Sequence, residues 1–212
     1  TNIVMLYAPF GVGAAIAATI GQSGLGVLWN LGYLVFTLYV ALAVFYLLVL
    51  IPVMVMFRIP IGAFLKAIKE PALIAFSTTS SEAALPRAME CVEAFGVPRR
   101  IVSFIMPLGY SFNLDGSTLY LSLAAVFVAQ AAGVDLTVGQ QVTMLLALML
   151  TSKGVAGVPR ASLVILAATL ANYNLPLEGI TLILGVDAIM DMGRTMTNVI
   201  GNCLASVVVA KW

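Results

Sequence analysis

The sequence predicts an all-α integral membrane protein, and three of its features favour that fold class. Hydrophobic residues make up 62% of the 212 residues and charged residues only 9%, whereas about 25% are charged in an ordinary soluble domain. The mean hydropathy is +1.09. Several apolar runs approach or exceed the roughly 20 residues that a helix needs to span a bilayer. A chain with so little polar surface needs membrane lipid around it.

Composition also narrows the possible functions. The net charge of +1 gives no reason to expect nucleic acid as a partner, and the absence of histidine removes the commonest metal ligand and proton shuttle. Cys91 and Cys203 lack metal-type spacing and are interpreted as small apolar fillers. No nucleophile–base pair indicates an enzyme, and no organic cofactor is expected. The chain begins in an apolar stretch without a methionine or leader, which predicts that it is the C-terminal part of a longer protein.

Residues 1–60 are expected to form two transmembrane helices. The first apolar run covers Ile3 to about Ile20, and the second, from about Val27 to Phe57, is long enough to span with tilt. Beyond them, we expect a broken helix over 99–133 and a final helix over 178–212. Two further segments do not fit a simple crossing.

The segment 61–98 is broken halfway by the polar run Ser77–Glu82, and basic residues flank it at both ends. If it crossed the membrane, one basic pair would lie outside, against the positive-inside tendency. A re-entrant hairpin from the cytoplasmic side keeps both pairs inside. The segment 137–175 is broken at Thr151–Arg160 and has acidic flanks, so it is predicted to enter from the opposite face. Lys211 then returns the C-terminus to the cytoplasmic side.

An internal repeat relates the two hairpins. Asp115 lies 29 residues after Pro86, and Asp187 lies 28 residues after Pro159; both prolines stand in the tripeptide Pro-Arg-Ala. Each unit is thus a hairpin followed by a helix that bears a buried acid, and the two units enter from opposite faces. This pattern indicates an inverted-topology repeat, whose interface near the bilayer midplane is the expected binding site.

The final helix carries a polar stripe formed by Asp187, Asp191, Arg194, Asn198 and Asn202. Successive members are 4, 3, 4 and 4 positions apart, which places them on one helix face. Each acid or arginine at the bilayer centre costs about 2.5–3.5 kcal/mol. An Asp–Arg pair that merely locks two helices together would explain two charges, but not three charges and two amides. The stripe therefore favours a functional site.

The groups in the stripe indicate an acidic amino acid as the ligand. Arg194 offers a planar fork suited to a carboxylate. Asp191 can accept an ammonium group, and Asn198 can bind a second carboxylate or an ion.

The run Asn113–Gly116 interrupts the broken helix, where backbone carbonyls can coordinate a cation and Asp115 can bind Na⁺ or a proton. A simple glycine kink is the alternative. The small-residue hairpin tips could present N–H groups to a carboxylate, although a solvent loop has the same composition.

Four motifs in chain order carry a resemblance: SSEAALP at Ser80–Pro86, NLDGS at Asn113–Ser117, GVAGVP at Gly154–Pro159 and DAIMDMGRTMTN at Asp187–Asn198. With them the chain resembles the dicarboxylate/amino acid:cation symporters, the glutamate transporter family, and most closely the bacterial proton/sodium–glutamate symporters. The resemblance runs from the family's fifth helix to the end of its eighth. It implies the C-terminal part of the glutamate transporter fold, a homotrimer in the cell membrane, elevator movement and an extracellular gate formed by the second hairpin.

The resemblance implies a role for each residue of a substrate site. Arg194 would hold the side-chain carboxylate with help from Ser117, and Asp191 would hold the amine. The α-carboxylate would be bound by Asn198, Ser81 and the tip backbone at Val158. The predicted substrate-binding set is completed by Ser80, Pro159, Arg160 and Thr195.

The resemblance also implies sites for the coupling ions, Na⁺ and/or H⁺. One set comprises Gly109, Asn113, Asp115, Asn198 and Asn202, and another comprises Ser111 with the carbonyls of Ser152, Lys153 and Val155. Sodium-coupled archaeal relatives have an aspartate at the position of Asn202, so its amide leaves proton coupling open. They also have an arginine in the first tip, where this chain has Thr79; Arg160 in the second tip could supply a similar charge. The family's third helix, which completes a further cation site, is missing.

Asp191 favours glutamate or aspartate over succinate, because C4-dicarboxylate carriers of the family have no amine to bind and lack an acid there. Arg194 argues against neutral amino acids. Two alternatives stay open: C4-dicarboxylate symport, and an ion channel or structural membrane protein in which the stripe lines a pore or joins helices.

Overall fold

The structure is a computed structural model that describes residues 26–151, 161–173, 175–177 and 179–212, together with four single residues before them. The regular elements in these ranges are all helical. In chain order they are α2 (Gly26–Phe45), η1 (Tyr46–Leu50), α3 (Ile51–Met56), α4 (Ile61–Thr78), α5 (Ser81–Ala94), α6 (Arg99–Phe112), α7 (Asp115–Ala131), α8 (Val138–Thr151), α9 (Ala161–Asn172), α10 (Gly179–Leu184) and α11 (Asp187–Lys211).

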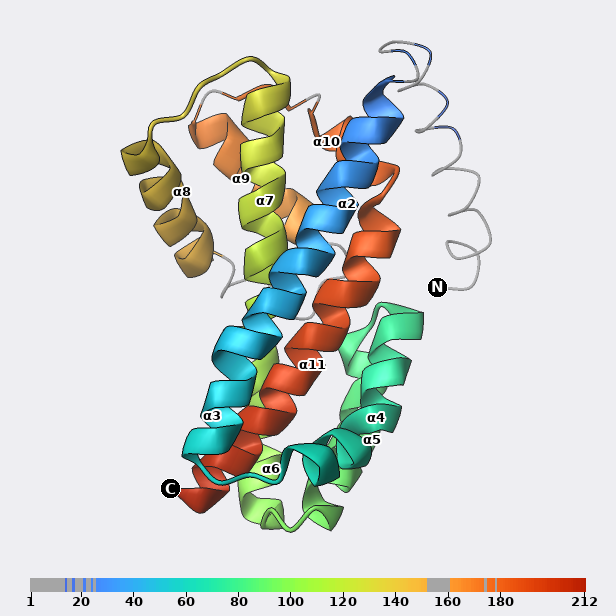
Figure 1. Cartoon of the computed structure of the whole chain (residues 1–212), viewed down its shortest axis with the longest axis vertical. Coiled ribbons are helices and arrows are strands. Elements are labelled where there is room, and N and C mark those ends of the chain that lie inside the picture. Colours follow the sequence, from blue (N-terminus) through green and yellow to red (C-terminus); the bar gives the residue numbers. More distant parts are fainter. Residues whose placement is uncertain are drawn as a thin grey trace.

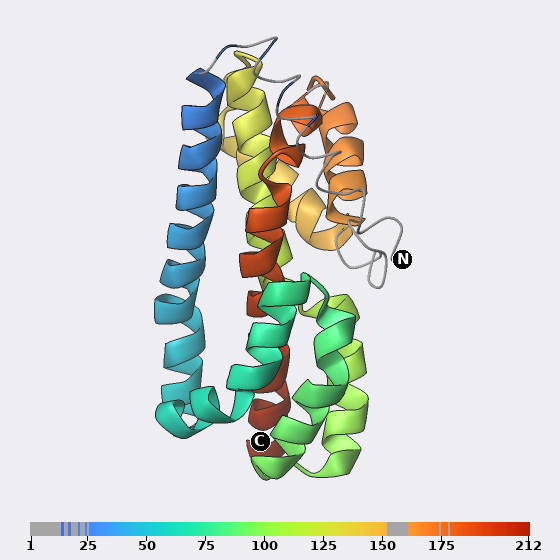
Figure 2. The same ribbon diagram turned by 90° about the vertical axis from the view of Figure 1, so that its right-hand side faces the viewer.

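Helix α11 runs through most of the length of the molecule, and the other helices surround it (Figure 1). The run formed by α2, η1 and α3 lies beside it, and α7 packs against its upper half in the view of Figure 1. Helices α4, α5 and α6 pack against its lower half. The pair α4–α5 and the pair α8–α9 therefore occupy opposite ends of the long axis (Figures 1 and 2).

A π-helical turn, η1, joins α2 to α3, and Pro52 explains its position. Proline has no N–H, and its ring crowds the carbonyl four residues earlier, so an α-helix cannot pass it unchanged. The backbone widens just before it, where the N–H of Ile51 bonds the carbonyl of Tyr46, five residues back. The turn also keeps one stripe of the helix buried, and that stripe consists of Leu34, Leu38, Leu42, Leu50 and Met54.

Helices α4 and α5 form an antiparallel hairpin whose turn lies near the middle of the molecule (Figure 2). Thr79 in the turn has a left-handed backbone with φ 52°. Ser80 then caps α5 by accepting a hydrogen bond of 3.2 Å from an N–H of its first turn. Farther from the turn, the guanidinium of Arg87 joins the arms, since it donates to Glu70 of α4 and to Glu90 of α5, each at 2.7 Å.

The core consists of two apolar clusters, and α11 contributes to both. One cluster gathers around Phe64 of α4 and Met106 of α6. The other gathers around Tyr120 and Leu121 of α7, with residues from α2, α8 and α9. Along the same helix, α11 also buries polar side chains, which are Asp187, Arg194, Thr195, Thr197, Asn198, Asn202 and Ser206.

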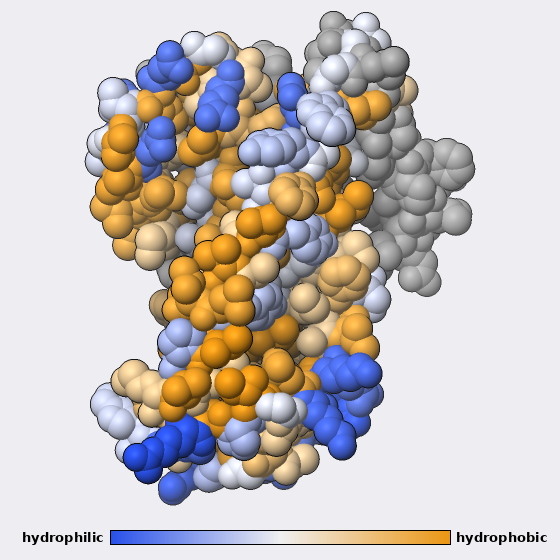
Figure 3. All heavy atoms as spheres, viewed as in Figure 1, coloured by the Kyte–Doolittle hydropathy of each residue, from blue (hydrophilic) through white to orange (hydrophobic). Residues whose placement is uncertain are grey.

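Two helical stretches within the described ranges are long and apolar enough to cross a membrane. They are Leu28–Met56, with 29 residues, and Arg99–Ala131, with 33 residues and a break between α6 and α7. The outer face of α2 exposes large apolar side chains, with Trp29 82% and Phe36 64% exposed. Apolar residues cover much of the middle of one face, and hydrophilic residues gather toward its ends (Figure 3). Such a surface suits lipid better than water.

Candidate functional site

The polar stripe predicted on the final helix lies on α11 and faces the interior. Asp187 and Arg194 are each 2% exposed, Asn198 is 4% exposed and Asn202 is 1% exposed, while Asp191 is half-buried. Burying charged and amide groups is costly unless they find partners. The partners come mainly from α6, α7 and α11 itself, and they divide the stripe into two clusters with a joint between them.

The first cluster surrounds the guanidinium of Arg194. Its Nε donates to Oδ1 of Asp191 at 2.8 Å, and its Nη1 lies 3.7 Å from Oδ1 of Asp187. The guanidinium carbon lies 4.1 Å from the ring centroid of Tyr120, a cation–π distance. Thr195 supports the same arrangement, because its hydroxyl donates to Oδ1 of Asp191 at 2.8 Å. One cation is thus held between two carboxylates and an aromatic face.

The guanidinium cluster retains unused hydrogen-bonding capacity. Among the described residues, neither Nη1 of Arg194 nor Oδ2 of Asp187 has a hydrogen-bond partner, although both atoms are buried. A guanidinium with a free donor can bind a carboxylate. The Arg194 side chain is only 3% exposed, so a ligand reaches it only when the groups that cover it move.

The joint between the clusters is made by Asn198 and the start of α7. The side-chain oxygen of Asn198 accepts hydrogen bonds from the N–H groups of Gly116, at 2.9 Å, and Ser117, at 3.4 Å. Its amide nitrogen donates to the Ser117 hydroxyl at 2.9 Å. Asn198 therefore caps the N-terminus of α7 from the neighbouring helix. Gly116 allows this close approach, since a Cβ there would lie 2.8 Å from Cα of Arg194.

The second cluster lies at the break between α6 and α7. In the amide orientation that satisfies its neighbours, Asn113 donates to the Asp115 carboxylate at 2.9 and 3.1 Å. Gly201 of α11 allows the carboxylate to approach, because a Cβ there would lie 2.8 Å from Oδ2 of Asp115. Gly109 of α6 contacts the side-chain oxygen of Asn202 in the same way. These carboxylate and amide oxygens are the kind of hard ligand that alkali and alkaline-earth cations prefer.

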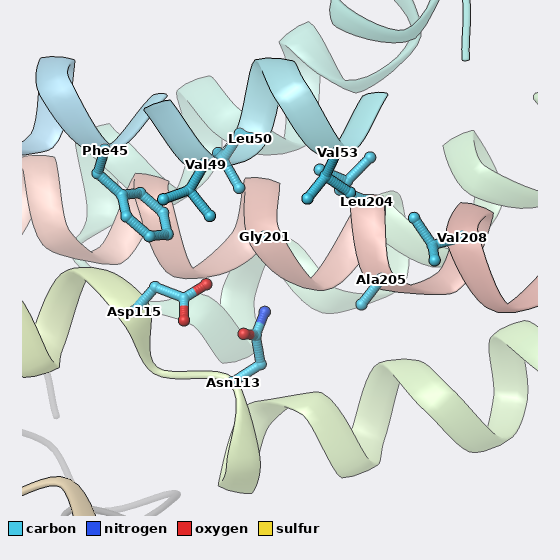
Figure 4. Close-up of a pocket in the computed structure, with 10 residues that line it drawn as sticks. All are labelled: Phe45, Val49, Leu50, Val53, Asn113, Asp115, Gly201, Leu204, Ala205 and Val208. Carbon is cyan, nitrogen blue, oxygen red and sulfur yellow. The ribbon is translucent and has the colours of Figure 1, made fainter. Parts of the chain in front are cut away.

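A pocket of about 290 Å³ opens beside this second cluster. Asn113 and Asp115, at the break between α6 and α7, form its polar end, and α11 runs between them and the run of η1 and α3 in the view of Figure 4. The rest of its wall is apolar and consists of Phe45, Val49, Leu50, Val53, Gly201, Leu204, Ala205 and Val208. No group of three or more His, Cys, Asp or Glu side chains that could hold a metal ion occurs in the part of the chain that the structure describes. The pocket therefore presents a single carboxylate and an amide.

Helix α2 and the turn η1 also bind α11 through two hydrogen bonds that lie outside these clusters. The hydroxyl of Tyr39 donates to the carbonyl of Ile189 at 2.8 Å. The hydroxyl of Thr197 donates to the carbonyl of Gly193 at 2.8 Å, so Tyr46 is the donor in its own 2.9 Å bond with Thr197. These contacts fix how α11 is rotated relative to α2.

The remaining predicted site residues are less closely connected to the clusters. Ser80 is used as the cap of α5, and the carbonyl of Ser81 accepts a hydrogen bond of 2.9 Å from Tyr110. Ser111 is half-buried at the end of α6, in neither cluster. The predictions on the second hairpin tip lie outside the described residues; they concern Ser152, Lys153, Val155, Val158, Pro159 and Arg160.

Sequence reasoning did not assign Tyr120 to the site, although the ring lies against the guanidinium. A signal for it was present, because Tyr120 follows Ser117 by three positions and so shares its helix face. Gly116 and Gly201 were also not recognised as points where two helices approach closely.

Long apolar helices that enclose a buried guanidinium and a carboxylate–amide cluster are typical of a membrane transport protein. The chain belongs to the sodium:dicarboxylate symporter family, whose family model matches residues 1–212. It is therefore a membrane protein of a transporter family and not of an enzyme family, as the sequence predicted.

Curated relatives of two kinds are similar to the chain along its whole length. The proton/sodium-glutamate symport protein of Bacillus subtilis (strain 168) is 53% identical over 211 residues, which are 100% of this chain and 49% of that protein. The proton/glutamate-aspartate symporter of Escherichia coli (strain K12) is 50% identical over 212 residues, 48% of that protein. A C4-dicarboxylate transport protein of Solibacter usitatus is 47% identical over 212 residues, 50% of that protein. The chain thus spans about half the length of these relatives.

Proposed function

We propose that this chain forms the substrate- and ion-handling core of a secondary symporter, which imports L-glutamate or L-aspartate together with Na⁺, H⁺ or both. The observation that carries the proposal is the buried guanidinium of Arg194, held by Asp191 and lying over Tyr120 with one donor unused. Charged side chains are rare inside membranes, and those that occur there usually bind a substrate or an ion. The names of the glutamate symporters among the relatives support the same substrate class.

The substrate's side-chain carboxylate would bind the free side of the Arg194 guanidinium. The Asp191 carboxylate would accept a hydrogen bond from the substrate's ammonium group, and its bond to Nε of Arg194 would weaken. Thr195 would continue to donate to the Asp191 carboxylate. An ammonium partner is what distinguishes an amino acid from a C4-dicarboxylate. Ser117 would help Arg194 to hold the side-chain carboxylate, and the α-carboxylate would meet Asn198 and the hairpin tips, including Ser81 and the residues around Val158.

The cations would bind at the break between α6 and α7. Asp115 would supply one negative charge there, and Asn113 and Asn202 would supply neutral oxygens. The carbonyl of Gly109, which accepts from the Asn113 N–H at 2.7 Å, would add another. An amide at position 202 leaves this cluster with one charge fewer than a carboxylate would. One charged ligand fewer means a weaker electrostatic attraction for Na⁺. The amide at position 202 therefore favours H⁺ as a coupling ion.

The pairs α4–α5 and α8–α9 are proposed to be re-entrant hairpins that enter from opposite membrane faces. Their positions at opposite ends of the long axis support this arrangement (Figure 2). The C-terminus is assigned to the cytoplasm, because Lys211 lies at the same end as Arg58, whose carbonyl accepts its hydrogen bond at 2.9 Å. Trimeric assembly and elevator movement, with the second hairpin as the gate, are carried over from the family resemblance.

The test is uptake of labelled glutamate into proteoliposomes of the protein as its gene encodes it. Na⁺ and H⁺ gradients are imposed separately and then together, with succinate and glutamine as competing substrates. We expect saturable accumulation against the glutamate gradient, driven by at least one of the two ions, with little competition from glutamine. A conductance that does not saturate, or equal competition by succinate, would contradict acidic amino acid symport.

A further inference from the structure

Asp187 belongs to the guanidinium cluster, but the roles assigned above do not use it. It is the first residue of α11 and is 2% exposed. Its Oδ1 accepts a hydrogen bond of 2.8 Å from the hydroxyl of Tyr120 and lies 3.7 Å from Nη1 of Arg194. Its Oδ2 is buried and has no hydrogen-bond partner among the described residues. A carboxylate accepts hydrogen bonds on both oxygens, so this group is only half satisfied as an anion.

Among the residues that the structure describes, the charges of the cluster do not balance. Asp187 and Asp191 are two carboxylates, and both face the single guanidinium of Arg194. Asp191 is the closer partner of the guanidinium, because its Oδ1 accepts a hydrogen bond from Nε of Arg194 at 2.8 Å. The same oxygen also accepts from the Thr195 hydroxyl at 2.8 Å. Two carboxylates near one cation leave one negative charge in excess, and like charges in a buried site disfavour each other.

Two features nevertheless allow Asp187 to be charged when the site holds no acidic ligand. The Tyr120 hydroxyl donates to it, and it lies in the first turn of α11, where the helix dipole favours a negative group. Asp187 thus has partners for one carboxylate oxygen, and its other oxygen, Oδ2, is free to carry a hydrogen. The arrival of a third carboxylate at Arg194 would remove most of the attraction between Arg194 and Asp187.

We propose that Asp187 is the proton-binding group that couples acidic substrate to H⁺, an inference that rests on the proposed symport function. When the substrate's carboxylate binds Arg194, Oδ2 of Asp187 takes one proton from the external solution. The neutral carboxyl then travels with the substrate, and after the substrate leaves Arg194 on the cytoplasmic side the same O–H bond breaks and the proton is released there. Substrate and proton thus promote each other's binding, as thermodynamic linkage requires.

The other titratable groups near Asp187 are less suited to this role. The Asp191 carboxylate already accepts from two donors, Arg194 and Thr195, and it is needed for the substrate's amine. Tyr120 donates its hydroxyl proton to Asp187 and so acts as a positioning residue. Tyr39, on the adjacent helix α2, bonds the carbonyl of Ile189 and not a carboxylate. Asp115 lies in the other cluster, beside Asn113.

The substitution Asp187→Asn tests the proposal, because the amide oxygen can still accept from Tyr120 but the side chain cannot gain a proton. Protons taken up per glutamate are counted with a pH-sensitive dye trapped in proteoliposomes, and glutamate affinity is measured from pH 6 to pH 9. We expect one proton fewer per glutamate than in the wild type. The wild-type affinity should weaken by up to about tenfold per pH unit on the alkaline side, and the Asp187→Asn affinity should be nearly independent of pH.

A pair of tyrosine variants tests the same idea without changing a charge. Tyr120→Phe removes the donor to Asp187, which disfavours the anion and moves the pH dependence of glutamate affinity to higher pH. Tyr39→Phe removes a hydroxyl that also contacts α11 but touches no carboxylate, so its pH profile should match the wild type. An unchanged pH profile in Tyr120→Phe, or an undiminished proton count in Asp187→Asn, would overturn the proposal.

The wild-type protein separates this inference from the function on which it rests. If the wild type accumulates no glutamate under any ion gradient, the symport proposal itself is wrong. If it accumulates glutamate without taking up protons, symport stands and the role of Asp187 is refuted.

Discussion

Substituting Gly116 by alanine tests how tightly α7 and α11 must pack at the joint between the two clusters. The added Cβ would lie 2.8 Å from Cα and 2.9 Å from the carbonyl carbon of Arg194. These are backbone atoms and cannot rotate away, so the helices must separate by roughly 0.6–1 Å to restore ordinary contact. That movement lengthens the 2.9 Å bond from the Gly116 N–H to Asn198 beyond hydrogen-bonding range.

The expected cost follows from three terms. Overpacking costs about 1–3 kcal/mol, loss of the Asn198 bond costs about 1 kcal/mol, and alanine regains up to about 1 kcal/mol of helix propensity. The net loss of stability is therefore about 1–4 kcal/mol. Glutamate affinity should fall as well, since Ser117 and Asn198 move away from Arg194.

The assay is thermal unfolding in detergent with and without glutamate, and Gly62→Ala is the matched control. Gly62 is also helical, but a Cβ there meets no atom within 4 Å. The control should therefore be neutral or more stable by up to about 1 kcal/mol. If Gly116→Ala is as stable as this control and binds glutamate normally, the close α7–α11 joint is not required and the reasoning is refuted.

The two clusters lead to two further predictions. Asp191→Asn retains an acceptor for Arg194 but loses the ammonium partner, so competition assays should show glutamate affinity falling by about 30-fold or more while succinate is affected less, because truncating a buried charge pair costs about 2–5 kcal/mol. Equal losses for both substrates would contradict the assignment of Asp191 to the amine. Asn202→Asp adds a negative charge beside Asp115, and a sodium titration of uptake should reach half-maximum at about tenfold lower Na⁺ if the charge contributes about 1.4 kcal/mol. An unchanged sodium requirement would show that Asn202 lies outside the cation site.

Helical spacing was enough to predict the polar stripe, because steps of three and four place side chains on one face whatever surrounds the helix. It could not predict which partner each member would find. Asn198 was expected to bind substrate or an ion, and in the structure its amide caps α7. Such a bond joins residues 82 positions apart, and only the packing of two helices determines it.

Local backbone features were predictable to different degrees. The break at Asn113 and Leu114 follows from polar and glycine residues within an apolar run, and α6 ends and α7 begins on either side of it. The π-helical turn before Pro52 was not anticipated, because a proline in a long apolar run is also compatible with a kink. The contact of Tyr120 with Arg194 was missed for another reason: its spacing from Ser117 places it on the same helix face, but a tyrosine in an apolar helix is usually interpreted as core.

The most direct test of the central claim is glutamate uptake by Arg194→Lys and Arg194→Ala in proteoliposomes. Lysine keeps the positive charge that Asp187 and Asp191 require, but it lacks the planar fork that binds a carboxylate through two donors. We predict that uptake of glutamate and aspartate is abolished in the alanine variant and reduced at least about 100-fold in the lysine variant, the equivalent of about 3 kcal/mol. Correct folding is checked by gel filtration, with Arg87→Ala as the control arginine outside the site. Undiminished acidic amino acid uptake in either Arg194 variant would contradict the account.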